Sequence, residues 1–223
     1  MTSKTSRLNP CQKPMGWLGR LLLWNMNSRH SKLTDWGLAQ ISIEKQATIL
    51  DVGCGGGRTV SKLAAIATQG KVYGLDYSPA SVAVAEKINR QWIAIGRVEI
   101  REGSVSRMPY ADSTFDLVTA VETHFWWPDL PGDMREVFRV VKPGGRLLVI
   151  AEIYKGATTA SARLAEKYPT GMKLLTIDEH RDLFQNTGYT DVRITVDAAK
   201  GWICGTGTKP MQGIDAKLVG VLR

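Results

Sequence analysis

Residues 49–57 read Ile49-Leu50-Asp51-Val52-Gly53-Cys54-Gly55-Gly56-Gly57. The stretch begins as a short apolar run that ends in an acid and continues into a glycine-rich turn. Residues 59–67, which follow the turn, have the apolar spacing of a helix. Because glycine has no Cβ, a ligand can lie directly against the backbone of such a turn. The stretch therefore predicts a strand, a ligand-binding turn and a helix in succession.

The segments downstream repeat this alternation. After the strand at 47–52, further strands are predicted at 71–76, 98–101, 115–121 and 146–152, and further helices at 81–95, 130–141 and 177–186. We expect Lys142-Pro143-Gly144-Gly145 to end one of these helices before the next strand begins. The last two predicted strands, 191–196 and 202–206, are joined by a short turn and must pair antiparallel. The expected fold is therefore α/β, doubly wound and Rossmann-like, with a seven-stranded, mostly parallel sheet that ends in an antiparallel hairpin.

The charge of the chain is unevenly distributed. The 223 residues include 29 Lys and Arg against 21 Asp and Glu, which gives a formal net charge of +8. Residues 1–40 hold six basic groups against one acid, and residues 197–223 hold four against two. A basic chain first suggests a nucleic-acid partner, but the body between these flanks is nearly neutral. We divide the chain into an N-terminal arm with lid helices (1–44), an α/β domain (45–208) and a C-terminal tail (209–223).

The three cysteines, Cys11, Cys54 and Cys204, lie far apart in the sequence. Their spacing predicts neither a disulfide framework nor a zinc site, so no metal is expected and a reducing, cytoplasmic setting fits best. The apolar run at residues 21–24 falls far short of the roughly 20 residues that span a membrane.

The spacing of the glycines limits the kinds of ligand that the turn can bind. A dinucleotide fingerprint that starts at Gly53 needs a third glycine at position 58, which is Arg58. The spacing present is Gly53-x-Gly55-x-Gly57, preceded by Asp51, which we expect to hold a cationic group. Asp76 ends the next strand, where a carboxylate can accept both hydroxyls of a ribose. The predicted ligand has a ribose and a cationic amino group, and no diphosphate.

Five motifs in this order resemble those of class I S-adenosylmethionine-dependent methyltransferases, of the small-molecule, ubiquinone-biosynthesis-like type. The resemblance covers residues 45 to about 208. The glycine motif is at residues 49–57, the ribose motif at 74–79 and the adenine motif at 103–110. The fourth motif is at 115–118, and the late motif is at 136–145.

The resemblance implies S-adenosylmethionine as cofactor, S-adenosylhomocysteine as product, and methyl transfer to a small-molecule acceptor by in-line displacement. The residues assigned to the cofactor are Asp51, Gly53, Cys54, Gly55, Gly57, Asp76, Tyr77, Ser104, Val105 and Val121. Cys54 is expected to be a small buried residue whose backbone faces the ligand. Ser104 departs from the family, which usually has an Asp there that accepts from the adenine amino group. A neutral hydroxyl accepts more weakly than a carboxylate.

The segment from Val121 to Asp129 follows the fourth long strand and should border the methyl group, because ligands of doubly wound sheets bind beyond the carboxyl ends of the strands. His124 is a candidate general base, and the alternative is a histidine that orders the loop. Glu122 is a second candidate catalytic residue, expected to contact the methionine part of the cofactor or the substrate, and its alternative is capping of the next helix. The predicted substrate side comprises His30, Phe125, Trp126, Trp127 and Tyr154. Core packing is the alternative for the large rings.

Two other functions stay open at this point. One is an RNA or protein methyltransferase. Amino-methylating nucleic-acid enzymes resemble one another in an Asn/Asp-Pro-Pro-aromatic motif after the fourth strand. Glu122-Thr123-His124-Phe125 stands there instead, which argues against a nucleic-acid acceptor. The other is a module that binds S-adenosylmethionine without catalysis. We expect a small acceptor, either anionic, because of the basic N-terminal region, or aromatic, because of the tryptophans. The sequence does not indicate an oligomeric state.

Overall fold

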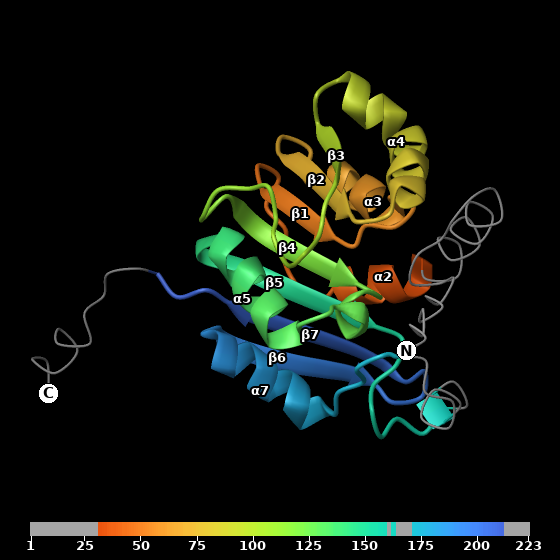
Figure 1. Ribbon diagram of the computed structural model, residues 1–223, viewed down its shortest axis with the longest axis vertical. Helices are drawn as coiled ribbons and strands as arrows, with labels where there is room; N and C mark the ends of the chain where they lie inside the picture. The colour runs from red at the N-terminus through yellow and green to blue at the C-terminus, as the bar shows by residue number, and fades with distance from the viewer. Residues whose placement is uncertain (1–30, 160–161, 164–170, 212–223) are drawn as a thin grey trace, which may run out of the picture.

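The computed structural model describes residues 31–159, 162–163 and 171–211 (Figure 1). Its strands are β1 (Thr48–Val52), β2 (Lys71–Asp76), β3 (Val98–Glu102), β4 (Phe115–Val121), β5 (Val141–Ala151), β6 (Thr190–Asp197) and β7 (Trp202–Thr208). Its helices are α2 (Ser31–Leu38), α3 (Arg58–Ile66), α4 (Pro79–Ala94), α5 (Leu130–Val140) and α7 (Ile177–Thr187), with a 3₁₀ turn η1 at His124–Trp126.

The seven strands form one sheet in the order β3-β2-β1-β4-β5-β7-β6. Strands β1 to β5 pair parallel, whereas β7 pairs antiparallel with both β5 and β6. The predicted fold class is confirmed, including the terminal hairpin. The strand order reverses between β1 and β4, and the cavity described below lies beyond the carboxyl ends of these two strands.

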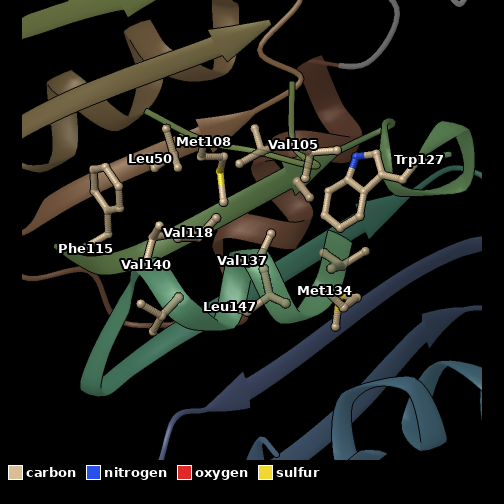
Figure 2. Packing of buried hydrophobic residues seen from close by; sticks show 14 of the residues in the cluster. Leu50, Val105, Met108, Phe115, Val118, Trp127, Met134, Val137, Val140 and Leu147 are labelled. Atoms are coloured by element: carbon tan, nitrogen blue, oxygen red, sulfur yellow. The ribbon is translucent and has the colours of Figure 1, made fainter. Parts of the chain in front are cut away.

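Side chains alternate between two apolar layers, one on each face of the sheet. Ile49 points into the layer under α2, α3 and α4, and its neighbour Leu50 points into the layer under α5 and α7. Leu147 and Leu148 on β5 alternate in the same way. Figure 1 shows α5 and α7 in front of the sheet, and Figure 2 shows the buried residues beneath α5. Burial on both faces explains why the strands read as nearly continuous apolar runs.

Local capping sets where the helices begin and end. Ser78 is the N-cap of α4, with Pro79 at the first helical position, so this helix begins two residues before the predicted start at residue 81. Thr176 and Glu179 form a reciprocal capping box at the start of α7. The same helix ends at Gly188, whose φ of 109° is in the left-handed region.

Strand β5 begins earlier than predicted. The stretch 142–145 was expected to separate a helix from the next strand, but β5 already begins at Val141. Val141 pairs with Phe115, and the next paired residues are Leu117 and Arg146, so the intervening residues form an irregularity within the strand. Lys209 from the end of β7 exchanges two backbone hydrogen bonds of 2.8 Å with Gly144 and Gly145, which stabilises this irregularity.

Part of the predicted N-terminal region is described. The region expected to carry lid helices (1–44) contains α2, which lies against β5 and β7 with Leu33 and Leu38 buried. Residues 1–30, His30 among them, lie outside the described residues, so the lid stays a prediction. At the other end, Lys209 is buried, and its ammonium group donates to the carbonyl of Phe138 at 2.7 Å. Packing thus continues one residue beyond the expected domain boundary at 208.

Cys54 and Cys204 are free and buried. None of the helices that the structure describes is long and apolar enough to cross a membrane. The described residues also contain no group of three or more His, Cys, Asp or Glu side chains that could hold a metal ion. The cytoplasmic setting stays a prediction.

Gly57 provides a test of the packing behind the glycine turn. Its φ is 76°, and a Cβ added there would lie 2.6 Å from Nδ2 of Asn89 and 2.8 Å from the backbone of Ala85. We expect Gly57→Ala to lower the free energy of unfolding by about 2–5 kcal/mol, because left-handed strain adds to overpacking. Gly96 is the matched control, since its φ is 75° and an added Cβ meets nothing within 4 Å.

Gly96→Ala should cost only the conformational part, about 1–2 kcal/mol. Urea unfolding of the two variants and the parent chain measures both losses. Equal losses at the two positions would contradict the packing described at Gly57.

Candidate active site

A cavity of about 280 Å³ lies beyond the carboxyl ends of β1 to β4. Its lining comes from the residues at or just after those strand ends, namely Val52, Gly53, Leu75, Asp76, Tyr77, Gly103, Ser104, Val105, Thr123, Trp126, Trp127 and Pro128. This is the position at which doubly wound sheets bind their ligands. A second cavity, of about 480 Å³, lies beside the opposite ends of β1 and β4, with Glu44, Asp116 and Arg146 in its wall.

The Asp76 carboxylate joins the turns that follow β1 and β2. One oxygen accepts the backbone N–H of Gly55 at 2.9 Å, and the other accepts the backbone N–H of Ser78 at 2.9 Å. Burial raises the pKa of Asp76, and these hydrogen bonds lower it. Each carboxylate oxygen has a second lone pair, so the group can still accept from ligand hydroxyls.

The first glycine of the turn is required by the protein itself. Gly53 has a φ of 69°, and a Cβ added there would lie 2.1 Å from Oγ1 of Thr123. Thr123 follows β4 and lines the same cavity. Glycine at position 53 therefore allows the turns after β1 and β4 to approach each other closely.

Asp51 is a buried acid behind this turn. It is 2% exposed, and its Oδ1 accepts a 2.6 Å hydrogen bond from the hydroxyl of Thr119. Burial, together with the nearby charge of Asp76, raises the pKa of Asp51 to about 7, and the bond from Thr119 opposes that rise. A positively charged ligand nearby would favour the ionised form.

The remaining walls are apolar and aromatic. Leu75 and Val105 line the cavity from the turns after β2 and β3. Trp127 is 3% exposed, and its indole N–H has no hydrogen-bond partner in the described structure. Figure 2 shows this ring beside Val105 in the buried cluster. These walls therefore suit a flat ring better than a strongly charged group.

The cavity brings together seven of the predicted site residues, which are Gly53, Asp76, Tyr77, Ser104, Val105, Trp126 and Trp127. The predicted residues outside its lining are Asp51, Cys54, Gly55, Gly57, Val121, Glu122, His124, Phe125 and Tyr154. Burial raises the pKa of the Cys54 thiol well above its usual value, as expected of a packed residue. Phe125 and Tyr154 are buried together in a separate apolar cluster behind the wall.

Both candidate catalytic residues are placed differently from the prediction. His124 is 2% exposed, with Nε2 3.1 Å from Nε2 of His180 on α7, and it does not line the cavity. This geometry gives a general-base role no support, since a base must reach the proton it removes. Glu122 has a φ of 58°, and its carboxylate accepts the backbone N–H of Glu152 at the end of β5.

Several residues that line the cavity were not predicted from the sequence. Val52, Leu75, Thr123 and Pro128 line the cavity, but as single apolar or small residues they give no signal of their own. Thr119 is internal to a predicted strand, and only the pairing of β1 with β4 brings its hydroxyl to Asp51.

Asp51 leads to a prediction on stability and pH. The folded chain keeps the Asp51 proton up to about pH 7, whereas the carboxyl has an ordinary pKa of 3.8, so stability should fall as the pH rises between these values. We expect Asp51→Asn to raise the free energy of unfolding at pH 8 by about 2–4 kcal/mol and to change it little at pH 4. Urea unfolding at both pH values measures the difference. If the free energy of unfolding changed with pH in the same way in both proteins, the raised pKa of Asp51 would be contradicted.

Comparison with known proteins places this site in a family. A family model described as a methyltransferase domain matches residues 50–149. The demethylmenaquinone methyltransferase of Lactiplantibacillus plantarum is 36% identical over 115 residues, which are 51% of this chain and 48% of that protein. The chain thus spans about half the length of such relatives. The uncharacterized methyltransferase YdaC of Bacillus subtilis is 26% identical over 83% of this chain and 96% of its own.

Solved structures share the fold. A complex between the Haloferax volcanii Trm112 methyltransferase activator and a methyltransferase matches with a TM-score of 0.74 and 22% identity, covering 87% of this chain and 96% of the other. A SAM-dependent methyltransferase from Aquifex aeolicus matches with a TM-score of 0.69 and 19% identity, covering 85% and 97%. Together with the match over residues 50–149 and the observed strand order, these similarities support the assignment of the chain to the class I S-adenosylmethionine-dependent methyltransferases.

Proposed function

We propose that this chain binds S-adenosylmethionine in the cavity beyond β1 to β4 and transfers its methyl group to a small-molecule acceptor. The main support for this proposal is the position of Asp76, which lies in the cavity wall and orients the glycine turn through its hydrogen bond with Gly55. That arrangement offers a carboxylate to a ribose beside a turn whose backbone a ligand can approach. The family and the fold support the choice of cofactor.

The remaining residues fit the parts of this cofactor. Leu75 and Val105 offer apolar surface to the adenine ring, and Ser104 offers a hydroxyl at its edge. Asp51, ionised by a neighbouring cation, would stabilise the positively charged methionine part. Gly55, Gly57, Cys54 and Val121, which the sequence assigned to the cofactor, do not line the cavity, and their contact with the cofactor stays a prediction.

The cofactor supplies a methyl group that its positively charged sulfur already activates. Among the described residues of the lining, only Asp76 and Tyr77 have titratable side chains, and burial raises the pKa of the Tyr77 phenol to about 12. The protein's task is then to align the acceptor for in-line displacement and to exclude water, rather than to remove a proton.

The aromatic wall indicates the kind of acceptor. Trp126, Trp127 and Pro128 line the cavity together and offer a flat apolar surface to an acceptor ring. The demethylmenaquinone methyltransferases among the relatives support a small-molecule acceptor, and its aromatic character rests on the cavity wall. An anionic acceptor depends on basic residues that lie mostly outside the described part of the chain, and it stays a prediction.

Ser104 provides a test of the cofactor site by gain of affinity. Its hydroxyl accepts the backbone N–H of Ser106 at 3.2 Å, a bond that an aspartate can also make. We expect Ser104→Asp to bind S-adenosylhomocysteine about 5-fold more tightly, because an ionised acceptor adds about 1 kcal/mol over a neutral one. Isothermal titration calorimetry at pH 7.5 measures the dissociation constants.

Ser106→Asp is the matched control, since it adds the same charge two residues away at an exposed position outside the lining. It should bind like the parent chain. Equal effects of the two substitutions would show that long-range charge, and not contact with the adenine, changes the affinity.

A transfer assay distinguishes the proposed function from its two rivals. The full chain is incubated with methyl-labelled S-adenosylmethionine and separate metabolite, RNA and protein fractions. Label in the metabolite fraction alone is the expected result. Label in RNA or protein would overturn the small-molecule acceptor, and binding without any transfer would favour a non-catalytic module.

A further inference from the structure

The aromatic wall of the cavity is held in place by a segment outside the cofactor motifs. Trp126, Trp127 and Pro128 form this wall, and Lys173 and His180 contact the stretch of chain that carries it. The backbone N–H of Lys173 donates to the carbonyl of Phe125 at 2.8 Å. The Lys173 ammonium donates to the carbonyl of Trp127 at 3.1 Å and to that of Pro128. The wall thus has one fixed contact with this segment through Lys173.

The second contact is the pair of rings His124 and His180, both of which are buried. Nδ1 of His180 lies 2.7 Å from the carbonyl oxygen of Thr176, which can only accept, so this nitrogen carries a proton. In a neutral His180 the other nitrogen, Nε2, must then be an acceptor. The proton in the 3.1 Å contact between the rings therefore belongs to Nε2 of His124.

This arrangement holds only while both rings are neutral. Nδ1 of His124 is left as a buried lone pair without a partner in the described structure. A proton added to Nε2 of His180 would place two N–H donors, the Nε2 groups of both rings, opposite each other. His124 could avoid this only by carrying its proton on Nδ1, which has no acceptor near it in the described structure. Burial lowers the pKa of both rings, which keeps them neutral near pH 7.

Few charged groups act on the pair. On α7, Glu179 partly opposes the lowered pKa of His180, and its carboxylate lies 3.8 Å from Nζ of Lys155 after β5. On α5, the Asp133 carboxylate accepts the backbone N–H of Asp129 at 3.0 Å. On the wall side, His124 packs against the ring of Phe125. The hydrogen bond between the rings is thus the polar connection that links η1 to α7 at this point.

We propose that His180 is a positioning residue for the cavity, which fixes the aromatic wall by accepting the hydrogen bond of His124 and releases it when the pair is protonated. His180 does not itself touch the ligand. The inference rests on the proposed function, because S-adenosylhomocysteine is the ligand that reports on the wall.

Two substitutions separate the hydrogen bond from the titration. Glutamine can accept from His124 through its carbonyl oxygen and does not titrate, whereas leucine leaves a buried donor unpaired. At pH 7.5 we expect His180→Leu to weaken S-adenosylhomocysteine binding about 5- to 20-fold and His180→Gln to change it less than about 2-fold. Arg181→Ala, at an exposed ion pair on the same helix, should bind like the parent chain.

The comparison is then repeated in steps from pH 6 down to pH 4, because burial lowers the pKa of both rings and their protonation requires a more acidic solution. The parent chain should lose more affinity than His180→Gln does, because the glutamine variant keeps only the pH dependence of Asp51. Parallel losses in the two proteins would overturn the proposal. Parent-like binding by His180→Leu at pH 7.5, even with a lowered melting temperature, would also overturn it and leave His180 a purely structural residue.

Long-range ¹H–¹⁵N NMR of the unliganded chain tests the pair without any ligand. The chain has three histidines, so the signals of His124 and His180 can be assigned with single variants. The expected tautomers at pH 7.5 are Nε2–H for His124 and Nδ1–H for His180. The opposite tautomer at His180 would overturn the inference. A parent chain that shows the expected tautomers but does not bind S-adenosylhomocysteine would instead overturn the proposed function.

Discussion

The carboxylate of Asp76 connects the two turns on which the site is built. By accepting the N–H groups of Gly55 and Ser78, one side chain at the end of β2 orients the glycine turn after β1 and the first residues of α4. A helix start, a ligand-binding turn and a cavity wall thus depend on one buried acid. Since the same carboxylate keeps free lone pairs, the group that organises the apo site also presents an acceptor to a ribose.

Building a site for a cationic ligand lowers the stability of the empty protein. Asp51 and Asp76 are both buried, and the charge of Asp76 raises the energy of the charged form of Asp51. A sulfonium or ammonium group placed near them would relieve that repulsion, so ligand binding and ionisation of Asp51 favour each other. The glycine turn also restricts the sequence. At positions 53 and 57, left-handed backbone conformations and close packing leave no room for residues other than glycine.

The fold could be predicted from the sequence because strand patterns, glycine turns and helix caps act locally. The five motifs also identified Asp76, Ser104 and Val105, which line the cavity. The contact between His124 and His180 could not be predicted, because the two residues are 56 positions apart and only the packing of α7 brings them together. The start of β5 was misplaced because pairing with Phe115 extends the strand through Pro143 and Gly144, which usually signal a break. Thr119 and Thr123 give no local signal, since their neighbours come from other strands.

The central claim is that the cavity beyond β1 to β4 is the cofactor site, and a crystal structure of the full chain with S-adenosylhomocysteine tests it most directly. The predicted result has the ribose hydroxyls at Asp76, the adenine between the turns that carry Leu75 and Val105, and the sulfur directed toward the aromatic wall. A ligand bound instead in the cavity beside Glu44, Asp116 and Arg146 would contradict the account.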